Sequence, residues 1–377
     1  MLCLAMTAPV LGQRLLYDLT GPPAATARSW ALGSVGVGDV NGDGKGDFAL
    51  VSELRSHGEL VCLSGADASS LWRTSLLRRT SPKTHLGRIG DLDADGVAEL
   101  LLADPEDSSH AGICQVFSGR LGGLLRTHRG PAASVRFGAS TVPLNDVDRD
   151  GVADYAVAVR GTNTGIPAEV VVFSGRTGLV HRRIKSHPGD SRFALHTMPA
   201  GDLDADGAVD LMIAVYSLHG TNRPAVHVFS ARTGQLIRTL GSTAQLFGGL
   251  GDLDSDGRDD FAYSRYNGRL EFAIVSGATQ ADLFVAPLPV NTWAWVLSGG
   301  LDVDGDRVPD FVLGENSALR GQFEVFSGRT RQRLYGGTWP RDIYGAMALA
   351  PDISGDGFFP GANDGFKVVT VRAAIPK

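Results

Sequence analysis

Short apolar runs alternate with glycine-rich polar turns along the whole chain. Between residues 247 and 285 the apolar runs are residues 247–251, 261–264, 270–275 and 283–285, and the turns between them are rich in Gly, Asp, Asn and Ser. Runs of this length, containing β-branched and aromatic side chains and bounded by turn residues, are typical of short strands. We therefore predict four antiparallel strands in this stretch, which we call strands A to D in chain order.

An acidic loop of the form Asp-x-Asp-x-Asp-Gly follows strand A and returns at intervals of 50 to 56 residues. Its seven copies start at Asp39, Asp91, Asp146, Asp202, Asp252, Asp302 and Asp352. A regular period of this size indicates a repeat architecture in which each unit buries its apolar face only against its neighbours. Four antiparallel strands per repeat make one propeller blade. The sequence thus predicts an all-β fold, a seven-bladed β-propeller of four-stranded antiparallel blades.

The two ends of the chain predict how the ring closes. The last repeat stops after its strand C, at about residues 366–371, with no strand D behind it. Residues 13–17 (Gln-Arg-Leu-Leu-Tyr) instead match residues 332–335 (Gln-Arg-Leu-Tyr), strand D of the sixth repeat. We therefore expect the N-terminal strand to complete the last blade, so that no edge strand is left exposed. Residues 13–377 then form one propeller domain. Residues 1–12 are an apolar run without a basic start, read either as a signal-peptide remnant or as a frayed terminus.

Large side chains tend to stand at the start of strand A, and we predict that they wedge between adjacent blades. They are Trp30, Leu86, Phe137, Phe193, Phe247, Trp293 and Tyr344. The chain has three cysteines, and Cys62 and Cys114 fall at different strand positions in neighbouring repeats. We expect both to be small buried apolar residues and not partners in a disulfide.

The acidic loops have the oxygen ligands of a calcium site. Calcium takes six to eight oxygen ligands at about 2.3–2.6 Å, and the loops offer carboxylates or an amide at positions 1, 3, 5 and 9 and a backbone carbonyl at position 7. A glycine at position 6, found in the first five copies, allows the positive φ of a tight turn. The predicted ligands, loop by loop, are Asp39, Asn41, Asp43, Lys45 and Asp47; Asp91, Asp93, Asp95, Val97 and Glu99; Asp146, Asp148, Asp150, Val152 and Asp154; Asp202, Asp204, Asp206, Ala208 and Asp210; Asp252, Asp254, Asp256, Arg258 and Asp260; and Asp302, Asp304, Asp306, Val308 and Asp310.

Two copies of the loop depart from the pattern. Loop six has Arg307 in place of glycine, which costs about 1 kcal/mol if φ is positive there; its four acids remain, so we still expect binding. Loop seven, starting at Asp352, has Ser354 and Pro360 at positions 3 and 9, so its site is degenerate. We therefore predict about six calcium ions.

Two other interpretations of the loops are weaker. An EF-hand needs a Glu at position 12 and flanking helices, whereas here the ninth-position acid runs directly into a strand residue such as Phe48 or Tyr155. Plain Asp-Gly turns without metal would leave three or four carboxylates repelling one another in each loop.

The formal charge of −6 has to be interpreted from the positions of the acids along the chain. Ligand positions of the six loops hold 23 of the 41 carboxylates. Six divalent cations would change the net charge to about +6, so the acidity is metal-ligand charge and not a nucleic-acid-repelling or basic-partner surface. As a separate expectation, we predict no nucleic-acid partner. No stretch of eighteen apolar residues occurs, which predicts no membrane span.

Phe-Gly pairs at the start of strand A, such as Phe137-Gly138 and Phe247-Gly248, join the acidic loops and the blade period in one pattern. Over residues 13–371 this pattern resembles the FG-GAP or VCBS-type repeat proteins, the seven-bladed propellers of integrin alpha N-termini and of many secreted bacterial proteins. The resemblance implies calcium in the loops and a ligand on the opposite rim, built by the B–C and D–A loops. That rim would present residues 160–163, 216–219, 265–267 and 339–342, whose Tyr, Asn, Arg and Trp suit protein or carbohydrate contacts.

Catalytic motifs are absent from the sequence: it has no nucleophile elbow, His-Glu-x-x-His, phosphate-binding glycine loop or Cys-x-x-Cys pair. Residues 104–107 (Asp-Pro-Glu-Asp) are read either as a carboxylate pair or as a solvated acidic turn. The leading hypothesis is a non-catalytic, calcium-stabilised binding or adhesion module for a protein or a glycan. The alternatives are a polysaccharide lyase or hydrolase on the same scaffold, and a purely architectural extracellular module. Sites with a Kd of about 10⁻⁴–10⁻³ M need extracellular calcium, so we expect a secreted, periplasmic or cell-surface location.

Overall fold

The computed structural model consists of short strands and turns. It describes residues 18–20, 27–339 and 370–372, with gaps inside the middle range at 55–56, 77–79, 82, 107–110, 132–134, 161–166, 188–192, 195, 217–223, 242–246, 289–294, 303 and 317–320. Across these residues the chain forms 26 strands, β1 to β26. None of the described segments is an apolar helix of the length that a bilayer crossing requires.

Six four-stranded antiparallel sheets follow one another along the chain, and we number them blades 1 to 6. Blades 1 to 3 are β2 (Ala27–Gly38), β3 (Asp47–Leu54), β4 (Gly58–Leu63) and β5 (Ser70–Ser75); β6 (His85–Arg88), β7 (Leu100–Asp104), β8 (Ile113–Phe117) and β9 (Leu124–Arg129); and β10 (Phe137–Pro143), β11 (Tyr155–Val159), β12 (Glu169–Phe173) and β13 (Val180–Lys185). Blades 4 to 6 are β14 (Thr197–Gly201), β15 (Asp210–Val215), β16 (Ala225–Phe229) and β17 (Leu236–Gly241); β18 (Phe247–Gly251), β19 (Asp260–Tyr266), β20 (Leu270–Val275) and β21 (Asp282–Pro287); and β22 (Trp295–Leu301), β23 (Asp310–Asn316), β24 (Gly321–Phe326) and β25 (Arg333–Trp339).

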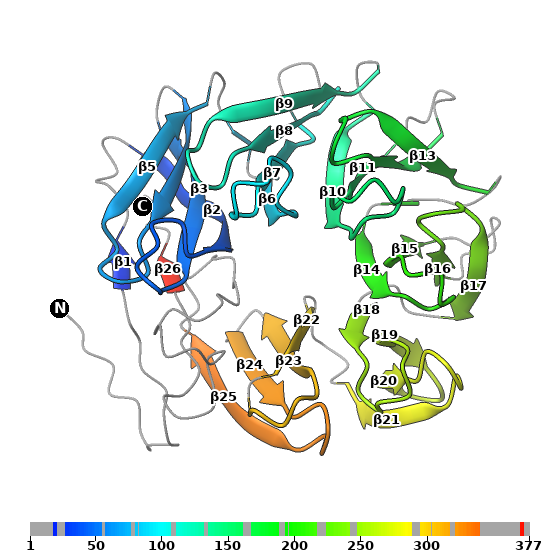
Figure 1. The fold of residues 1–377 in the computed structure, drawn as a ribbon. Coiled ribbons are helices and arrows are strands. Elements are labelled where there is room, and N and C mark those ends of the chain that lie inside the picture. The colour runs from blue at the N-terminus through cyan, green and yellow to red at the C-terminus, as the bar shows by residue number, and fades with distance from the viewer. Residues whose placement is uncertain are drawn as a thin grey trace.

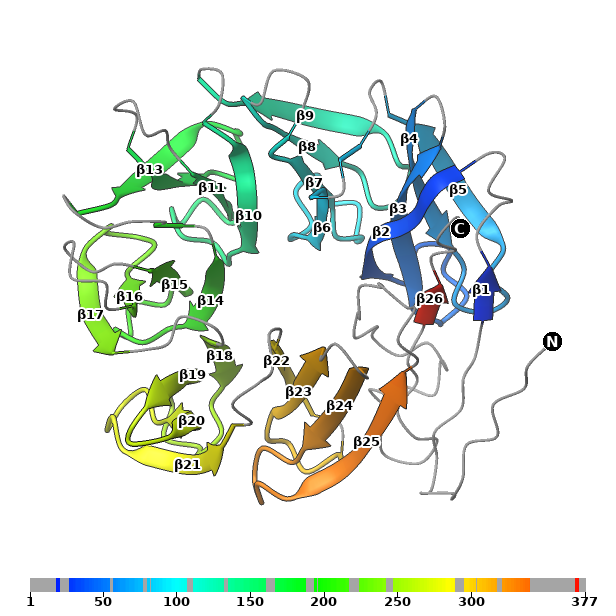
Figure 2. The ribbon, with the colours of Figure 1, turned by 180° about the vertical axis from the view of Figure 1, so that it is seen from behind.

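The blades stand in a ring around a common centre (Figures 1 and 2). The first strand of each blade lies toward the centre and the fourth lies on the outside. Neighbouring inner strands pack against each other, as β14 does against β18 and β18 against β22. This arrangement confirms the predicted all-β propeller and its four-stranded antiparallel blades.

The apolar core lies between the blades and not inside them, because each sheet is a single layer and must cover its faces with its neighbours. Phe137, 3% exposed, packs in one cluster with Ala103 of blade 2 and Val157 of blade 3. Phe193 and Phe247 take the same place between blades 3 and 4 and between blades 4 and 5. The wedge prediction is confirmed for these three residues.

Two of the remaining wedge residues, Trp293 and Tyr344, lie outside the described residues, as does the side chain of Trp30. Leu86 is half-buried against the cluster between blades 1 and 2. Cys62 and Cys114 are free and fully buried in two different clusters, as predicted.

A second contact between blades links each outer strand of blades 1 to 3 to the C–D turn of the next blade. The Trp72 indole of blade 1 donates a 2.9 Å hydrogen bond to a carbonyl of the C–D turn in blade 2. Arg126 of blade 2 donates to the Arg176 carbonyl at 2.7 Å, and Arg182 of blade 3 to the Arg232 carbonyl at 2.8 Å. Apolar seams and these polar links therefore join the same pairs of neighbours.

The first and last described strands lie side by side next to blade 1 (Figures 1 and 2). Strand β1 (Asp18–Thr20) pairs with β26 (Thr370–Arg372), and β26 also packs against β2. The pairing is parallel, whereas a strand D added to a strand C would be antiparallel. Residues 13–17 and most of the seventh repeat lie outside the described residues, so the closed seventh blade stays a prediction.

Candidate metal centres

Each acidic loop occupies the turn from strand A to strand B. In blade 5, for example, β18 ends at Gly251, the loop starts at Asp252, and its ninth residue, Asp260, opens β19. Strands A and C run in the same direction in an antiparallel meander, so the A–B loops share one rim with the C–D turns. The metal loops and the Ser-Gly turns after strand C are therefore neighbours.

The loop backbone holds the first three acids in place. In blade 2, Asp91 accepts hydrogen bonds from the backbone N–H of Asp95 at 3.2 Å and of Gly96 at 2.9 Å. Asp93 accepts from the same N–H of Asp95 at 3.3 Å, and Asp95 accepts from the N–H of Val97 at 2.9 Å. The other five loops repeat all four bonds. The carboxylates are thus turned toward the loop interior by the chain itself.

Two positions of each loop are left-handed. Position 6 has positive φ in all six loops, including the non-glycine Arg307 at φ 69°, as predicted. Position 4 is also left-handed, and it is a residue other than glycine in four loops: Ala94, Arg149, Ala205 and Ser255. An L-residue costs about 1–2 kcal/mol in this conformation. The sequence did not reveal position 4, because only loops one and six carry glycine there.

The ninth-position acids are buried and tie the metal loop to the C–D turn. Asp154 is fully buried; one of its oxygens accepts from the Val147 N–H at 2.8 Å and the other from the Gly175 N–H at 2.7 Å. The corresponding acids of blades 1 and 5 accept equivalent pairs of backbone hydrogen bonds, and Asp310 of blade 6 accepts from the N–H groups of Asp304 at 3.1 Å and Gly328 at 2.7 Å. These acids therefore have a structural role that the ligand pattern alone did not predict.

Blades 2 and 4 differ in this respect. Glu99 and Asp210 are fully buried, and one oxygen of each, Glu99 Oε1 and Asp210 Oδ1, has no hydrogen-bond partner. Burial, reinforced by the neighbouring loop carboxylates, raises the pKa of Glu99 to about 7 and that of Asp210 to about 8. A buried carboxylate oxygen without a donor needs a cation or a proton. The two oxygens are the feature of this structure that fits a bound cation best.

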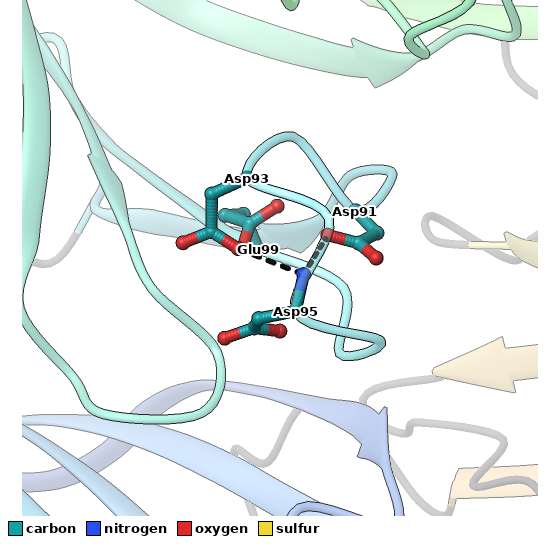
Figure 3. Close-up of side chains that lie close together, drawn as sticks. All are labelled: Asp91, Asp93, Asp95 and Glu99. Atoms are coloured by element: carbon teal, nitrogen blue, oxygen red, sulfur yellow. Dashed lines mark hydrogen bonds between the residues drawn. The ribbon is translucent and has the colours of Figure 1, made fainter.

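Carboxylate oxygens gather within each loop. In blade 2, Asp91, Asp93, Asp95 and Glu99 each offer an oxygen within 4.8 Å of the others (Figure 3). Equivalent groups in blades 3 to 6 are Asp146, Asp148 and Asp154; Asp202, Asp204 and Asp206; Asp252, Asp254 and Asp260; and Asp302, Asp304 and Asp306. Donor sets made only of oxygen favour hard cations such as calcium and magnesium over zinc. The acidic clusters are thus compatible with calcium.

Loop one is the least acidic of the six. Its third position is Asn41, whose amide donates to Asp43 at 2.9 Å, while Asp39 accepts the usual backbone hydrogen bonds. Loop seven, starting at Asp352, lies outside the described residues. The full ligand sets, including the position-7 carbonyls, remain predictions.

An arginine of the C–D turn reaches the metal loop in four blades: Arg120, Arg176, Arg232 and Arg329. In blade 6 the Nε of Arg329 lies 3.0 Å from Asp306 Oδ2, and its Nη2 donates to the Asp306 carbonyl at 2.8 Å. The aspartate is always the fifth residue of the loop. Sequence comparison of the repeats shows the turn as Phe-Ser-Gly-Arg in three blades and Phe-Ser-Ala-Arg in blade 4, but the partner of the arginine appears only in the structure.

The opposite rim is described only in part. Residues 161–166, 217–223 and 340–342 lie outside the described residues, which leaves the 265–267 hairpin as its best-described segment. Tyr266 is 73% exposed there. Arg265 instead forms ion pairs with Asp282 at 2.6 Å and Glu271 at 3.5 Å, so its guanidinium is engaged within blade 5.

The acidic segment at residues 104–107 is neither a free carboxylate pair nor a simple solvated turn. Asp104 is buried and accepts two hydrogen bonds from Ser81, at 2.6 and 3.1 Å. Glu106 forms ion pairs with Lys83 at 2.6 Å and Arg136 at 3.7 Å. Both carboxylates therefore link separate segments of blade 2 and its neighbouring connections, which argues against a catalytic carboxylate pair at residues 104–107.

Exposed apolar side chains lie on the metal-loop side of blades 2 to 4, a feature that the sequence pattern did not predict. Leu121 and Leu179, in the C–D turns of blades 2 and 3, are 74% and 70% exposed. The starts of the outer strands add Leu124, Leu125, Val180 and Leu236.

Sequence relatives support the architecture. The chain is 27% identical to integrin alpha-5 of Xenopus laevis over 219 residues, which are 52% of this chain and 21% of the relative. It is 27% identical to integrin alpha-V of Gallus gallus over 241 residues, 56% of this chain and 23% of the relative. The repeats are integrin-alpha-like FG-GAP repeats. The chain spans less than a quarter of the length of these integrin subunits.

Structural comparison gives the same fold. The crystal structure of BBS1N in complex with ARL6DN, soaked with lead, aligns with a TM-score of 0.56 and 13% identity. The alignment covers 96% of this chain and 97% of that chain. No family model matches the sequence.

Proposed function

We propose that this integrin-alpha-like propeller is a calcium-stabilised binding module that works outside the cytoplasm. The observation that carries the proposal is the repeated oxygen cage. In each of six loops, backbone N–H groups orient three side chains inward, and in two loops a buried carboxylate oxygen lacks any donor. Hard oxygen ligands and closely spaced negative charges are what calcium requires.

Calcium is a better fit than magnesium. Magnesium demands a near-ideal octahedron and keeps several of its waters, whereas calcium accepts six to eight ligands in flexible geometry. Blade 2 alone offers four carboxylates, those of Asp91, Asp93, Asp95 and Glu99. Removing one water after another to bind so many carboxylates is unfavourable for magnesium.

The location follows from the affinity of such loops. Extracellular calcium-binding modules have a Kd of about 10⁻⁴–10⁻³ M, far above the cytosolic concentration of free calcium. Without the cation, several carboxylates would face one another in each loop and weaken the fold. We therefore propose a secreted, periplasmic or cell-surface protein.

The ligand is proposed to be a protein or a glycan bound on the rim formed by the B–C and D–A loops. Tyr266 supports this rim, because an exposed tyrosine offers both an apolar face and a hydroxyl to a partner. The lyase or hydrolase alternative gains no support from the described residues, since Asp104 and Glu106 are both held in structural contacts.

Thermal unfolding in chelator, in millimolar calcium and in millimolar magnesium tests the metal part of the proposal. Each calcium site should add roughly 0.5–1.4 kcal/mol at these affinities, so six sites add several kcal/mol, comparable to the stability of a whole domain. We expect the melting temperature to rise clearly with calcium and little with magnesium. An unchanged melting temperature in chelator would overturn the proposal.

A glycan array and a panel of extracellular matrix proteins, run beside a lyase assay, test the binding part. Tyr266→Ala should weaken binding to a ligand held by the proposed rim, while Leu179→Ser on the metal-loop side should leave it unchanged. The reverse result would move the binding surface to the metal-loop side. Turnover of a polysaccharide would replace the binding function with the enzymatic alternative.

A further inference from the structure

Blades 3 and 5 form a natural matched pair. Their loops carry the same acids at the same positions: Asp146, Asp148, Asp150 and Asp154 in one, and Asp252, Asp254, Asp256 and Asp260 in the other. Their C–D turns read Ser-Gly-Arg-Thr (residues 174–177) and Ser-Gly-Ala-Thr (residues 276–279). In both, the serine hydroxyl donates to the fifth-position aspartate at 3.1 Å. The one difference within the turn is Arg176 against Ala278.

The arginine places a positive charge directly on a predicted metal ligand. Arg176 Nε lies 3.6 Å from Asp150 Oδ1, and Arg176 Nη2 donates to the Asp150 carbonyl at 2.5 Å. Arg120, Arg232 and Arg329 make the same two contacts in their blades. In blades 1 and 5, by contrast, Ala66 and Ala278 stand at this position.

Other arginines also lie near both loops. Arg149 of loop three and Arg258 of loop five both donate to backbone carbonyls of blade 4, at 3.5 and 3.0 Å. The following blade also supplies one arginine to each loop. Arg232 donates to two carbonyls of loop three, and Arg331 interacts electrostatically with Asp254 and Asp260. The blades thus differ here as well, because Arg331 acts on two carboxylates of loop five whereas Arg232 contacts backbone carbonyls of loop three, so the charge at the Arg176 and Ala278 position is isolated by substitution within each blade.

We propose that this C–D turn arginine divides the calcium sites into a weaker class, in blades 2, 3, 4 and 6, and a tighter site in blade 5. The inference rests on the proposed calcium binding. A cation entering an arginine-bearing loop meets a fixed positive charge and a carboxylate already paired with it. That repulsion lowers the affinity roughly three- to tenfold for a divalent ion. Blade 1 also lacks the arginine, but its Asn41 removes one negative charge, so its site falls between the two classes.

The same arginine acts in the opposite direction when calcium is absent. It then provides the counter-charge for the fifth-position aspartate and holds the loop in its cage shape. A purely structural hydrogen bond would stabilise both the metal-free and the calcium-loaded protein. An arginine that acts through its charge stabilises the metal-free protein and reduces the gain in stability that calcium brings. Whether the arginine raises or lowers the stabilisation by calcium therefore distinguishes a structural hydrogen bond from an electrostatic effect on calcium affinity.

Reciprocal substitutions in the full chain test the proposal, with calcium itself as the probe. Ala278 is exposed, so Ala278→Arg adds the charge to blade 5 without disturbing the core. Arg176→Ala removes the charge from blade 3, and Arg176→Lys keeps the charge but lacks the planar guanidinium group with its paired N–H donors. Calcium isotherms are measured by competition with a chromogenic chelator, and melting temperatures are measured in excess chelator and in calcium.

We expect wild type to show one site about three- to tenfold tighter than the main class. Ala278→Arg should abolish that site, Arg176→Ala should create a second one, and Arg176→Lys should resemble wild type. The rise in melting temperature between chelator and calcium should grow in Arg176→Ala and shrink in Ala278→Arg.

The outcomes separate this inference from the function on which it rests. Absence of calcium binding by wild type overturns the proposed function itself. Calcium binding with isotherms that neither reciprocal variant changes overturns the two-class proposal and leaves the calcium function standing. If Arg176→Ala fails to fold, the exposed Ala278→Arg variant still decides the question.

Discussion

Single residues in the metal loops store backbone strain that the sequence pattern does not show. Position 6 was predictable because glycine stands there in five of the first six loops. Position 4 was not, since Ala94 and Ser255 are ordinary loop residues in sequence, yet they adopt φ of 62° and 61°. The hydrogen bonds from the fifth and sixth N–H groups to the first carboxylate enforce this conformation, and such bonds leave no mark in composition.

Loop four offers a matched test of this strain. Ala205, at φ 62°, should gain roughly 0.5–1 kcal/mol of stability when changed to glycine, because the steric cost of its Cβ is removed. Gly207, at φ 86°, has open space around its missing Cβ, so Gly207→Ala should lose about 1–2 kcal/mol through conformation alone. Denaturant unfolding measures both. Equal and small effects at the two positions would contradict the strain argument.

The ninth-position and third-position acids should respond differently to calcium. Asp260 is buried and accepts backbone hydrogen bonds from Leu253 at 2.8 Å and Gly277 at 2.9 Å. Asp260→Asn should therefore cost about 1–3 kcal/mol even in chelator, because the single amide oxygen leaves one of the two buried N–H groups without its acceptor. Asp254 is exposed, so Asp254→Asn should change stability little in chelator and should reduce the stabilisation by calcium. Melting curves in the two buffers check the pair, and equal losses for Asp254→Asn in both buffers would refute its ligand role.

At the scale of strands and turns, the sequence predicted the elements well where periodicity and turn chemistry agree. In blade 5 the predicted first and third strands coincide with β18 and β20, and the turn at Asn267 has Gly268 at φ 73°. The contacts between elements were harder to predict from the sequence. The links from Arg126 and Arg182 to the next blade depend on how two blades are placed, which no local pattern encodes.

A histidine between blades 2 and 3 makes stability depend on pH. The His128 Nε2 lies 2.7 Å from the Tyr155 hydroxyl, and the ring lies 4.2 Å from that of Phe173. Burial, and secondarily the charge of Arg126, lowers the pKa of His128 to about 4. Because the folded pKa is below the unfolded value of about 6.5, this contribution is complete above pH ~6.5 and is lost as the pH falls toward about 4.

The loss should be about 1–2 kcal/mol, allowing for solvent screening of a half-buried ring. His128→Asn should flatten the decline in melting temperature between pH 7 and pH 4.5 relative to wild type, and loop carboxylates common to both proteins cancel in the difference. Parallel declines in the two proteins would show that another group controls the acid sensitivity.

At the scale of the whole molecule, the repeats and the arrangement of the blades were predictable from the sequence, while the closure of the ring stays a prediction. The period of the acidic loop predicted the six described blades in their order, and the wedge residues Phe137, Phe193 and Phe247 indicated where the core lies. Residues 13–17 lie outside the described residues, and their match to a strand D predicted only that the N-terminal strand joins the last repeat. It did not predict that β1 and β26 pair in parallel, because a match in side chains does not fix the direction of pairing.

Truncation tests whether the N-terminal segment stabilises the ring. Deleting residues 1–20 removes β1 and leaves β26 without its partner, so we expect a lower melting temperature for the whole chain. Deleting residues 1–12 removes no described strand and should leave the melting temperature unchanged. Identical melting temperatures for all three proteins would show that the segment plays no part in closure.

The seams between blades determine where this chain can be cut and rejoined. Every apolar cluster in the described part of the ring belongs to two adjacent blades, and the first and last described strands, β1 and β26, lie side by side. New termini at a D–A connection, such as residues 132–134, would keep every sheet and every seam whole, with a short linker joining the old ends. New termini inside a blade would split a sheet. With the seventh blade closed as predicted, the order of the blades around the ring would not depend on which D–A connection is left open.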